Sequence, residues 1–478
     1  MDTGLIAPSP ELKRTPTLAH SLIPIVGTAL LIGVGFGVYK IKVEVMLVIA
    51  TALTGGLARW LGLGWREMQA GMLQSIMKGM PAMLIVVVVG ALIASWLAAG
   101  TIPMIIYYGL GMISPRMFLV TASLATGLVS CLTGTGYGTI GTVGVAFMGI
   151  AHGLGVPAGP AAGALVAGAY LGDKISPFAA NANFAVAVAR VNIYDHIRHC
   201  LWTTVPAFGV GLVAYALVGG HHAAIVVHGS LAADDEVRQA LAKAFVFSPW
   251  LLLPPLLTLV LAIGNRPVLP GMLLSVAVAV VLAVVVQGVP VVDALNITVA
   301  GYTPHTGLAL VDRLLAQGGM EAMMHVTLIA LCAFAFSGVL QKAGLLEPVL
   351  QRLFKFTTNT SRLVAATAAG CLVVELMTGA AFVCILLPSE LFGPVYRRLG
   401  LAGKNLTRVV GDCGIVGVPL LPWSIAGAFM SGTLGVPVMT YAPWAVFCYA
   451  GVAFTLLAGL TGLTMAPRIN EDETQPGS

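Results

Sequence analysis

Asp173 and Lys174 are adjacent, opposite charges in the middle of the apolar stretch 163–189. A charge at bilayer depth costs roughly 3 kcal/mol, so it usually faces a site or a partner rather than lipid. Gly172 precedes the two charges and Pro177 follows them, and proline disfavours helix at and before its position. Unwound backbone at membrane depth is tolerated only inside protein or beside water. The stretch therefore predicts a discontinuous helix that holds an ion or a small solute. The alternative is a cytoplasmic loop between two short helices.

Two further carboxylates occur in apolar surroundings. Asp412 follows Gly411 as Asp173 follows Gly172, and prolines come after both pairs. Glu375 lies in the apolar run CLVVELMTG. We predict Asp173, Asp412 and Glu375 as cation- or proton-binding groups, because a carboxylate can take up a hard cation or a proton, and the two uses compete. For Glu375 two interpretations stay open: a proton carrier that lines a hinge, or a satisfied buried acid.

Lys174 is a candidate counter-ion for Asp173, but consecutive helical residues point about 100° apart, so this pairing would need the helix to break. Neutral oxygen and amide groups near the hinges complete the expected site. The alternative for any one threonine is a hydrogen bond to the carbonyl four residues earlier. We expect no cofactor and no metal beyond a transported sodium ion. The predicted lining residues are Thr133, Thr135, Tyr137, Lys174, Ser176, Asn181, Asn183, Thr378 and Ser424.

The composition excludes a soluble globular protein. Of the 478 residues, 58% are hydrophobic and 9% are charged, whereas soluble domains have about 25% charged residues. The seven cysteines are scattered without a C-x-x-C pair, which favours small buried residues over disulfides or a metal site. The sequence contains no HExxH motif, nucleophile elbow or phosphate loop. We therefore predict a multi-pass membrane protein that is not an enzyme and binds no nucleic acid.

The apolar spans and polar stretches divide the chain into tails, spans and two larger units. The predicted parts are a cytoplasmic tail (1–20), an N-terminal transmembrane pair (21–63), a first repeat (70–220), a polar loop (221–247), a linking transmembrane pair (248–288), a second repeat (310–463) and a second cytoplasmic tail (464–478).

The repeat rests on landmarks that recur at a nearly constant separation. Thr133-Gly134 recurs as Thr378-Gly379, each at the centre of an apolar hairpin, and Gly172-Asp173 recurs as Gly411-Asp412. The final span 441–463 matches 199–219. The second half of the chain is therefore predicted to repeat the hairpin and the broken helix of the first half.

The charges of corresponding loops are opposite in character. After the hairpins, 151–160 has no Lys or Arg, whereas 397–408 is strongly basic. After the broken helices, 190–198 is basic, whereas 431–443 has no charge. Because basic loops stay in the cytoplasm, corresponding loops should lie on opposite sides of the membrane. We predict an all-α polytopic membrane protein of two inverted-topology repeats with helical hairpins and discontinuous transmembrane helices, the architecture of secondary transporters.

The chain resembles the NhaC family of sodium/proton antiporters, within the ion transporter superfamily, in the segments TGTGYGTIGTVGVAFMGIA, GDKISP, LLPSELF, GLAGKNLTR and GDCGIVGVPLLPWSIAGAF. The resemblance extends from about residue 70 to 460 and preserves order and spacing. It implies exchange of cytoplasmic sodium for external protons, or, as in some relatives, exchange of an organic acid or amino acid coupled to these ions. The alternative of a channel is disfavoured, because a channel would not need an inverted pair of broken helices.

The chain departs from the family pattern at several oxygen-bearing positions. Where the family commonly has Ser-Asp-Thr after GDKxSP, this chain has Ala179, Ala180 and Asn181, and Gly417 stands at another such position. The substrate therefore stays open between sodium and a small organic solute, each exchanged for protons. We expect a protein of the bacterial inner membrane with both termini in the cytoplasm, with the lipid bilayer and the transported solutes as partners, and a homodimer as an open alternative.

Overall fold

The structure is a computed structural model that describes residues 14–36, 39, 41–226, 230–263, 268–308, 311–312, 315–316 and 318–467. Parts of both predicted tails, residues 1–13 and 468–478, lie outside the described residues. The described chain is built from helices, with one isolated bridge between Leu401 and Pro467. Among the described residues, five helices are long and apolar enough to cross a bilayer, and up to eight spans result if each bent helix pair counts as one. The protein is an all-α, multi-pass membrane protein, as predicted.

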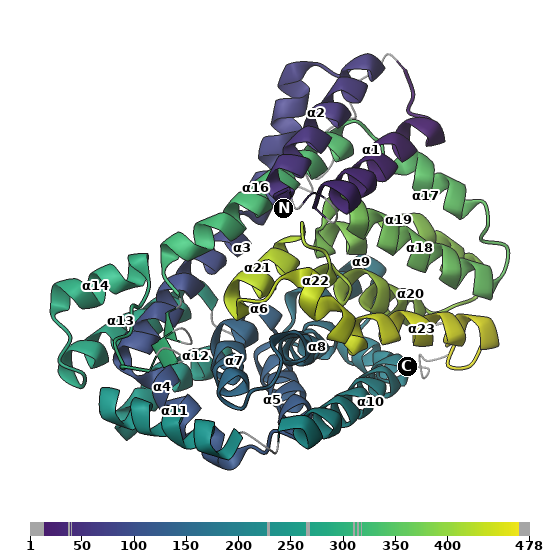
Figure 1. Cartoon of the computed structure of the whole chain (residues 1–478). Helices are drawn as coiled ribbons and strands as arrows, with labels where there is room; N and C mark the ends of the chain where they lie inside the picture. The colour runs from purple at the N-terminus through teal and green to yellow at the C-terminus, as the bar shows by residue number, and fades with distance from the viewer. Residues whose placement is uncertain are drawn as a thin grey trace, which may run out of the picture.

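The first repeat begins with one long helix and ends with another. Its elements are α3 (Trp65–Ala99), α4 (Thr101–Met112), α5 (Phe118–Thr133), α6 (Gly136–Thr139), the π-helical turn η2 (Ile140–Gly144), α7 (Val145–Gly153), α8 (Ala158–Ile175), α9 (Ala180–Ala189) and α10 (Ile193–Val226). Helices α5 and α6–α7 form the first hairpin, and α8–α9 is the first broken helix (Figure 1).

The second repeat has the same order of elements. They are α16 (Met320–Lys342), α17 (Glu347–Phe354), α18 (Thr360–Thr378), α19 (Ala381–Arg398), α20 (Gly403–Val410), η4 (Gly411–Ile415), η5 (Val418–Leu420), α21 (Ile425–Leu434), α22 (Val438–Tyr441), η6 (Ala442–Trp444) and α23 (Val446–Thr461). Helices α18 and α19 form the second hairpin. The second broken helix runs from α20 to α21 and bends by 48°.

The other helices lie at the two ends of the long α3–α16 pair (Figure 1). At one end are α1 (Leu18–Leu30), η1 (Leu31–Phe36) and α2 (Val43–Leu61). At the other end are α11 (Ser230–Ala244), η3 (Pro249–Leu252), α12 (Leu253–Ile263), α13 (Val268–Val285) and α14 (Val291–Ala300). Arg66 and Lys78 lie within α3, because the helix begins at Trp65.

Corresponding helices of the two repeats pack antiparallel. Gly71 of α3 lies against Gly338 of α16, whereas Gly90, further along α3, lies against Gly319. Glycine at these contacts lets the two backbones approach closely, as in other membrane helix pairs. In the second pair, Tyr215 Oη of α10 donates to the carbonyl of Trp444, just before α23, at 2.7 Å.

The loops gather on two faces according to their charge. The uncharged segments meet where Gly159 contacts Thr440. The basic segments meet where Gly403 contacts Val191 and where Arg190 lies across a cleft from Lys404. Helices α8–α9 therefore run from the uncharged face to the basic face, and α20–α21 run the opposite way. The predicted inverted repeat is confirmed, while the domain boundaries given above stay predictions.

A glycine with a positive φ angle forms the tip of each hairpin. Gly134 has φ 70° and Gly379 has φ 59°, a region that residues with a Cβ avoid. Each tip also packs directly on a break. A methyl group on Gly134 would lie 2.6 Å from the carbonyl oxygen of Phe178, and one on Gly379 would lie 2.9 Å from Cα of Ser424. The repeated Thr-Gly pair thus closes each hairpin and seats it on the broken helix of its own repeat.

Candidate functional site

The first break lies at Ser176–Ala179, between α8 and α9. Pro177 cannot continue the helical hydrogen bonds, and Ser176 adopts an extended conformation before it. The Ser176 hydroxyl donates to the carbonyl of Cys131 in the first hairpin at 2.7 Å and accepts from the amide of Phe178 at 3.2 Å. The break is thus a fixed part of the fold, held by the hairpin.

Asp173 lies one turn before this break, with only 5% of its surface exposed. The amide of Asn181, in the first turn of α9, donates to Asp173 Oδ2 at 2.9 Å. The backbone of Gly136, at the start of α6, also lies near this carboxylate. No lysine, arginine or histidine among the described residues forms an ion pair with Asp173. The carboxylate is therefore balanced only by neutral donors and the start of a short helix.

The second break extends from Val416 to Ser424, between η4 and α21, and contains the short turn η5. Ser424 caps the start of α21 by accepting from the amide of Gly427 at 2.8 Å. Its hydroxyl donates back to the carbonyl of Val418 at 2.6 Å. Trp423 Nε1 donates to the carbonyl of Leu376 in the second hairpin at 3.0 Å. The second hairpin and the second break are thus tied together as the first two are.

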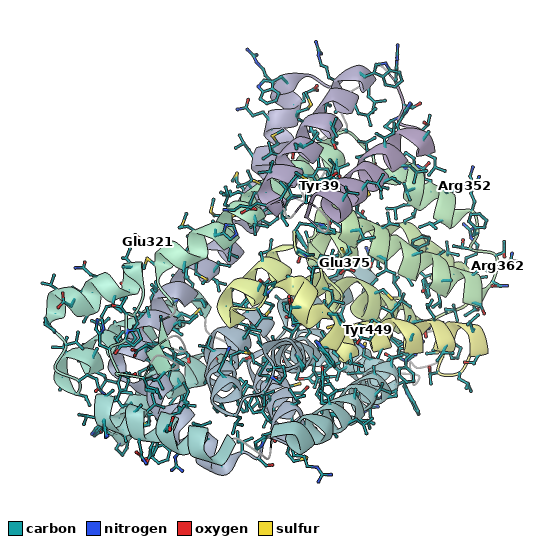
Figure 2. The ribbon with its side chains drawn as sticks, viewed as in Figure 1. Tyr39, Glu321, Arg352, Arg362, Glu375 and Tyr449 are labelled. Atoms are coloured by element: carbon teal, nitrogen blue, oxygen red, sulfur yellow. The ribbon has the colours of Figure 1, made fainter. Side chains whose placement is uncertain are left out.

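Glu375 points into this second break from the last turns of α18. Its side chain is 3% exposed, and Figure 2 places it in the interior of the molecule, whereas Arg352 and Arg362 lie at the edge. A methyl group on Gly417 would lie 2.6 Å from Glu375 Oε1. Within the described chain, Glu375 Oε2 has no hydrogen-bond partner. A carboxyl group with one oxygen unpartnered among the described residues therefore faces the unwound backbone of the second break.

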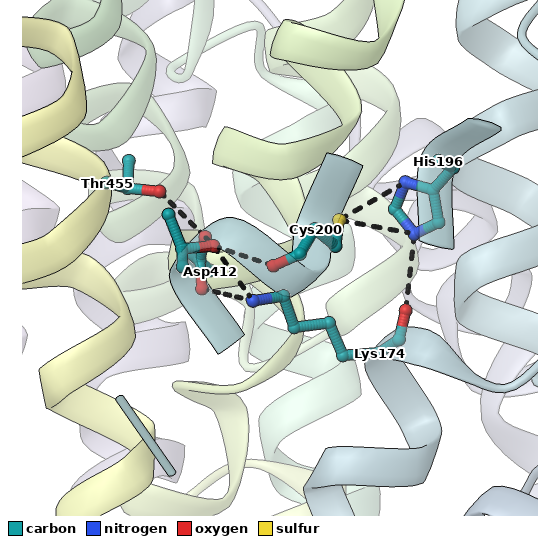
Figure 3. Close-up of polar contacts among 6 residues, drawn as sticks. Lys174, His196, Cys200, Asp412 and Thr455 are labelled. Carbon is teal, nitrogen blue, oxygen red and sulfur yellow. Dashed lines mark hydrogen bonds and ion pairs between the residues drawn. The ribbon is translucent and has the colours of Figure 1, made fainter. Parts of the chain in front are cut away.

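Asp412 is surrounded by donors instead (Figure 3). Lys174 Nζ forms an ion pair with Asp412 Oδ1, and neither side chain is exposed. The hydroxyls of Thr203 and Thr455 donate to Oδ2 at 2.8 Å and 2.7 Å. Lys174 therefore compensates Asp412 of the other repeat, and the expectation that it would be the counter-ion of its neighbour Asp173 is wrong.

Sequence reasoning missed Thr203, Thr455 and His196. Thr203 lies in α10 and Thr455 lies in α23, the two spans that the repeat relates. The only sequence signal that could have indicated them was a hydroxyl-bearing residue in each of these apolar spans. His196 Nε2 lies 3.2 Å from the carbonyl of Lys174. These contacts depend on how α10 and α23 pack, which the repeat pattern by itself does not give.

The neutral residues of the predicted lining mostly hydrogen-bond to backbone. Thr135 caps α6 by accepting from Gly138, and Thr378 donates to the carbonyl of Val374 at 2.8 Å. Asn183 donates to the carbonyls of Pro177 and Ala179, and the hydroxyl of Thr133 lies 3.4 Å from that of Thr139. A hydroxyl that donates its proton keeps lone pairs that can coordinate a cation.

Two cavities are relevant to these elements, one beside the first hairpin tip and one at the basic face. One of about 270 Å³ is mostly apolar and has Thr133, Thr135 and Thr142 in one wall and Trp96 in another. The other, of about 1080 Å³, lies at the basic face between the α9–α10 junction and α19–α20. Its charged and amide lining residues are Arg190, Asn192, Asp195, Glu390, Arg397 and Lys404.

Similarity to known proteins agrees with this arrangement. The sequence pattern of the Na+/H+ antiporter family matches residues 168–463, more than half of the chain. The chain belongs to the Na+/H+ antiporter family. The first break and the whole broken helix of the second repeat lie within the matched residues. The resemblance to sodium/proton antiporters predicted from the segments quoted above is therefore confirmed.

Relatives within this family cover nearly the whole chain but carry different names. An "Uncharacterized Na(+)/H(+) antiporter" of Haemophilus influenzae is 39% identical over 95% of this chain and 98% of its own length. The Na+/H+ antiporter NhaC of Alkalihalophilus pseudofirmus is 35% identical over 89% of this chain and 92% of its own length. The arginine/ornithine antiporter ArcD of Halobacterium salinarum is 32% identical over 97% of this chain and 96% of its own length. Relatives at similar distance are thus named for sodium and for amino acids.

Proposed function

We propose that the protein is a secondary antiporter that exchanges sodium ions for protons across the membrane, with Asp173 and Glu375 as its coupling carboxylates. The observation that carries the proposal is a buried acid without a cationic partner at each break, among the described residues of a Na+/H+ antiporter family member. Ionisable groups at membrane depth mark ion pathways and proton relays. Broken helices in inverted repeats are where secondary transporters bind their ions.

Asp173 is suited to a hard cation. Neutral oxygens lie on the adjoining segments: the hydroxyls of Thr133 and Thr135 at the hairpin tip and the carbonyls of the unwound segment after Ser176. Carboxylate and carbonyl oxygens are the ligands that hard cations prefer. Sodium bound here would replace the missing positive partner of Asp173.

Glu375 is suited to a proton. An isolated ionised carboxylate is costly to bury, whereas the neutral acid is not. Among the described residues its Oε2 has no hydrogen-bond donor, and an alanine, Ala380, follows the tip glycine where Thr135 follows it in the first hairpin. Protonation of Glu375 would neutralise its carboxyl group, so the second break could change conformation within the membrane without carrying a net charge.

The third predicted acid, Asp412, stays a prediction as a coupling group. Its carboxylate is compensated by Lys174 and receives hydroxyl donors on its other oxygen. A cation could bind there only if the lysine left, so the geometry favours Asp173 and Glu375.

The cleft on the basic face offers an access route to both acids. Helix α9 extends from the first break to the cleft, and α19 extends from the second hairpin tip to the same cleft. Phe184 of α9 and Phe382 of α19 pack against each other between the cleft and the breaks, with ring centroids 5.1 Å apart. We propose that solute enters from the cleft and passes this aromatic pair before it reaches the breaks.

The test is exchange by the purified protein in proteoliposomes. A pH gradient across the membrane should dissipate when sodium is added, and potassium should have a weaker effect. Lithium serves as a second small cation. Selective collapse of the gradient by potassium, or by no cation at all, would overturn the sodium proposal.

A second candidate is exchange of an amino acid or organic acid for protons. It is favoured by Ala179 and Ala180, which carry no side-chain oxygen at the first break. A positively charged side chain available to bind a substrate carboxylate would also support this candidate, but Lys174 is already paired with Asp412. The same proteoliposomes should therefore be screened with arginine, ornithine, lactate and malate, and gradient collapse by one of these without sodium would favour this candidate.

We propose that the basic face is cytoplasmic and that the protein lies in the bacterial inner membrane with both termini in the cytoplasm. Cysteine substitutions at Met439 and Leu399 test the orientation, because both side chains are exposed. Met439 lies on the uncharged face and Leu399 lies on the basic face. Cysteine at Met439 should react with a membrane-impermeant maleimide in intact cells, and cysteine at Leu399 only after lysis. The reverse result would contradict this orientation.

A further inference from the structure

The ion pair between Lys174 and Asp412 joins the two repeats at their broken helices. Lys174 belongs to the last turn of α8, and Asp412 belongs to the π-helical turn η4, 238 residues away in sequence. Thr203 of α10 and Thr455 of α23 complete the shell of the carboxylate. One buried carboxylate thus receives donors from three other elements, drawn from both repeats (Figure 3).

Other charged and titratable groups near the pair have their own contacts. Arg408, one turn before Asp412, is buried and donates to Thr464 and Met465 rather than to Asp412. His196 and Cys200 of α10 contact each other, and His196 also contacts the backbone of Lys174. Lys174 is therefore the cation that compensates Asp412.

The position of Lys174 determines where its neighbour points. Asp173 and Lys174 are consecutive on α8, so their side chains leave the helix about 100° apart. Lys174 is directed to the other repeat, and Asp173 is directed to Asn181 and the first hairpin tip. Because α8 ends at Ile175, no further helical turn holds the orientation of these residues.

We propose that Lys174 and Asp412 are positioning residues that hold the last turn of α8 in the orientation that aims Asp173 at the first hairpin. Thr203 and Thr455 support this role by donating to the oxygen of Asp412 that Lys174 leaves free. The inference rests on the proposed role of Asp173, and it assigns Asp412 to the support of the site rather than to the transported ion. The pair connects the first break to the second because each partner belongs to a different broken helix.

Neutralising one partner and neutralising both should have different effects. A single change leaves an uncompensated buried charge, whereas replacing both partners of a buried ion pair by neutral groups is often tolerated. Lys174→Gln and Asp412→Asn keep similar volumes, and together they would form a neutral amide pair. The four proteins of this cycle are the wild type, the two single variants and the double variant.

Sodium-dependent exchange in proteoliposomes is the first measurement. Each single variant should lose exchange by about tenfold or more, with a raised sodium concentration at half-maximal rate, and the double variant should return to within about threefold of the wild type. The pH at half-maximal exchange should be the same in the double variant and the wild type. A double variant as inactive as Asp412→Asn, or one with a shifted pH midpoint, would mean that Asp412 itself binds the ion or proton.

Thr455→Val tests the same point without removing a charge. It takes one hydroxyl donor from Asp412, and Thr461→Val is the matched control, since Thr461 in the same helix donates only to its own backbone. Under the proposal, Thr455→Val slows exchange while its pH midpoint stays at that of the control. A shift of the midpoint would overturn it.

Thermal unfolding of the same proteins in detergent separates this inference from the proposed function. If the wild type exchanges no sodium, the proposed function fails. The double variant should still unfold at a temperature closer to the wild type than either single variant does. If it unfolds below both, the pair does not act as an ion pair that tolerates joint replacement, and the positioning role fails as well.

Discussion

The two breaks share a backbone plan but hold their acids on different elements. At the first break, the acid is Asp173 on the broken helix itself, with Asn181 as its amide partner. At the second break, the equivalent residue of the broken helix, Asp412, is paired with Lys174. The acid that faces the second break is Glu375, from the hairpin leg, and Oε2 of its carboxyl has no partner among the described residues.

The difference teaches that an inverted repeat can keep its backbone symmetric while its chemistry becomes asymmetric. The hairpin position that corresponds to Glu375 in the first repeat is Ser130, which donates to the carbonyl of Ala169. The first repeat therefore has its acid on the broken helix, and the second has it on the hairpin. We infer a division of roles in which the first break binds the cation and the second carries the proton.

Among the variants that test this division of roles, Asp173→Asn should reduce exchange the most. Asn keeps the volume and one oxygen but removes the charge that a cation needs, so both sodium/proton exchange and sodium/sodium exchange should fall to the level of empty liposomes. Uptake of radioactive sodium and collapse of a pH gradient measure the two activities. Asp293→Asn, in exposed α14, is the matched control and should exchange normally.

Glu375→Gln should separate the two activities. If the second break carries only the proton, this variant loses sodium/proton exchange but keeps sodium/sodium exchange, because the first break is intact. The same two assays apply, with Glu321→Gln on α16 as the control. Loss of sodium/sodium exchange as well would mean that Glu375 also contributes to the cation site, and the division of roles would fail.

Gly417→Ala tests the tight contact at the second break. The added methyl group would lie 2.6 Å from Glu375 Oε1, so the acid must move, and such overpacking costs about 1–3 kcal/mol. We expect a lower unfolding temperature and slower proton-coupled exchange. Gly393→Ala in α19, the other leg of the hairpin that carries Glu375, meets its nearest neighbour at 3.5 Å and should have little effect on unfolding. Equal behaviour of the two variants would show that Glu375 is not held against the break.

Ala180→Asp should have the smallest effect, at the first break. Ala180 is exposed in the first turn of α9, where a negative charge is favoured by about 0.3–1 kcal/mol. An added carboxylate beside Asn181 should lower the sodium concentration at half-maximal exchange by about two- to fivefold. Ala187→Asp, near the other end of α9, should bring no gain. A gain in both variants would indicate general attraction of cations rather than a completed site.

The sequence predicted the parts of the site better than their pairing. Pro177 and the repeated Gly-Asp located both breaks, because proline and charge at membrane depth leave few alternatives. The missing oxygen at Gly417 was also visible. Only the structure shows that a larger residue there would collide with Glu375, which is remote from it in sequence.

The sequence by itself determined the membrane fold, the inverted repeat and the identity of the three buried acids. These follow from hydropathy, loop charge and local backbone chemistry, which act between residues close in the chain. The tertiary structure decided that Lys174 compensates Asp412 and that Thr203 and Thr455 donate hydrogen bonds to the same carboxylate. It also decided that Glu375 faces the second break. Such contacts depend on which faces of distant helices pack together, and a helix rotated by one residue, about 100°, would turn Asp173 to the direction in which Lys174 now points.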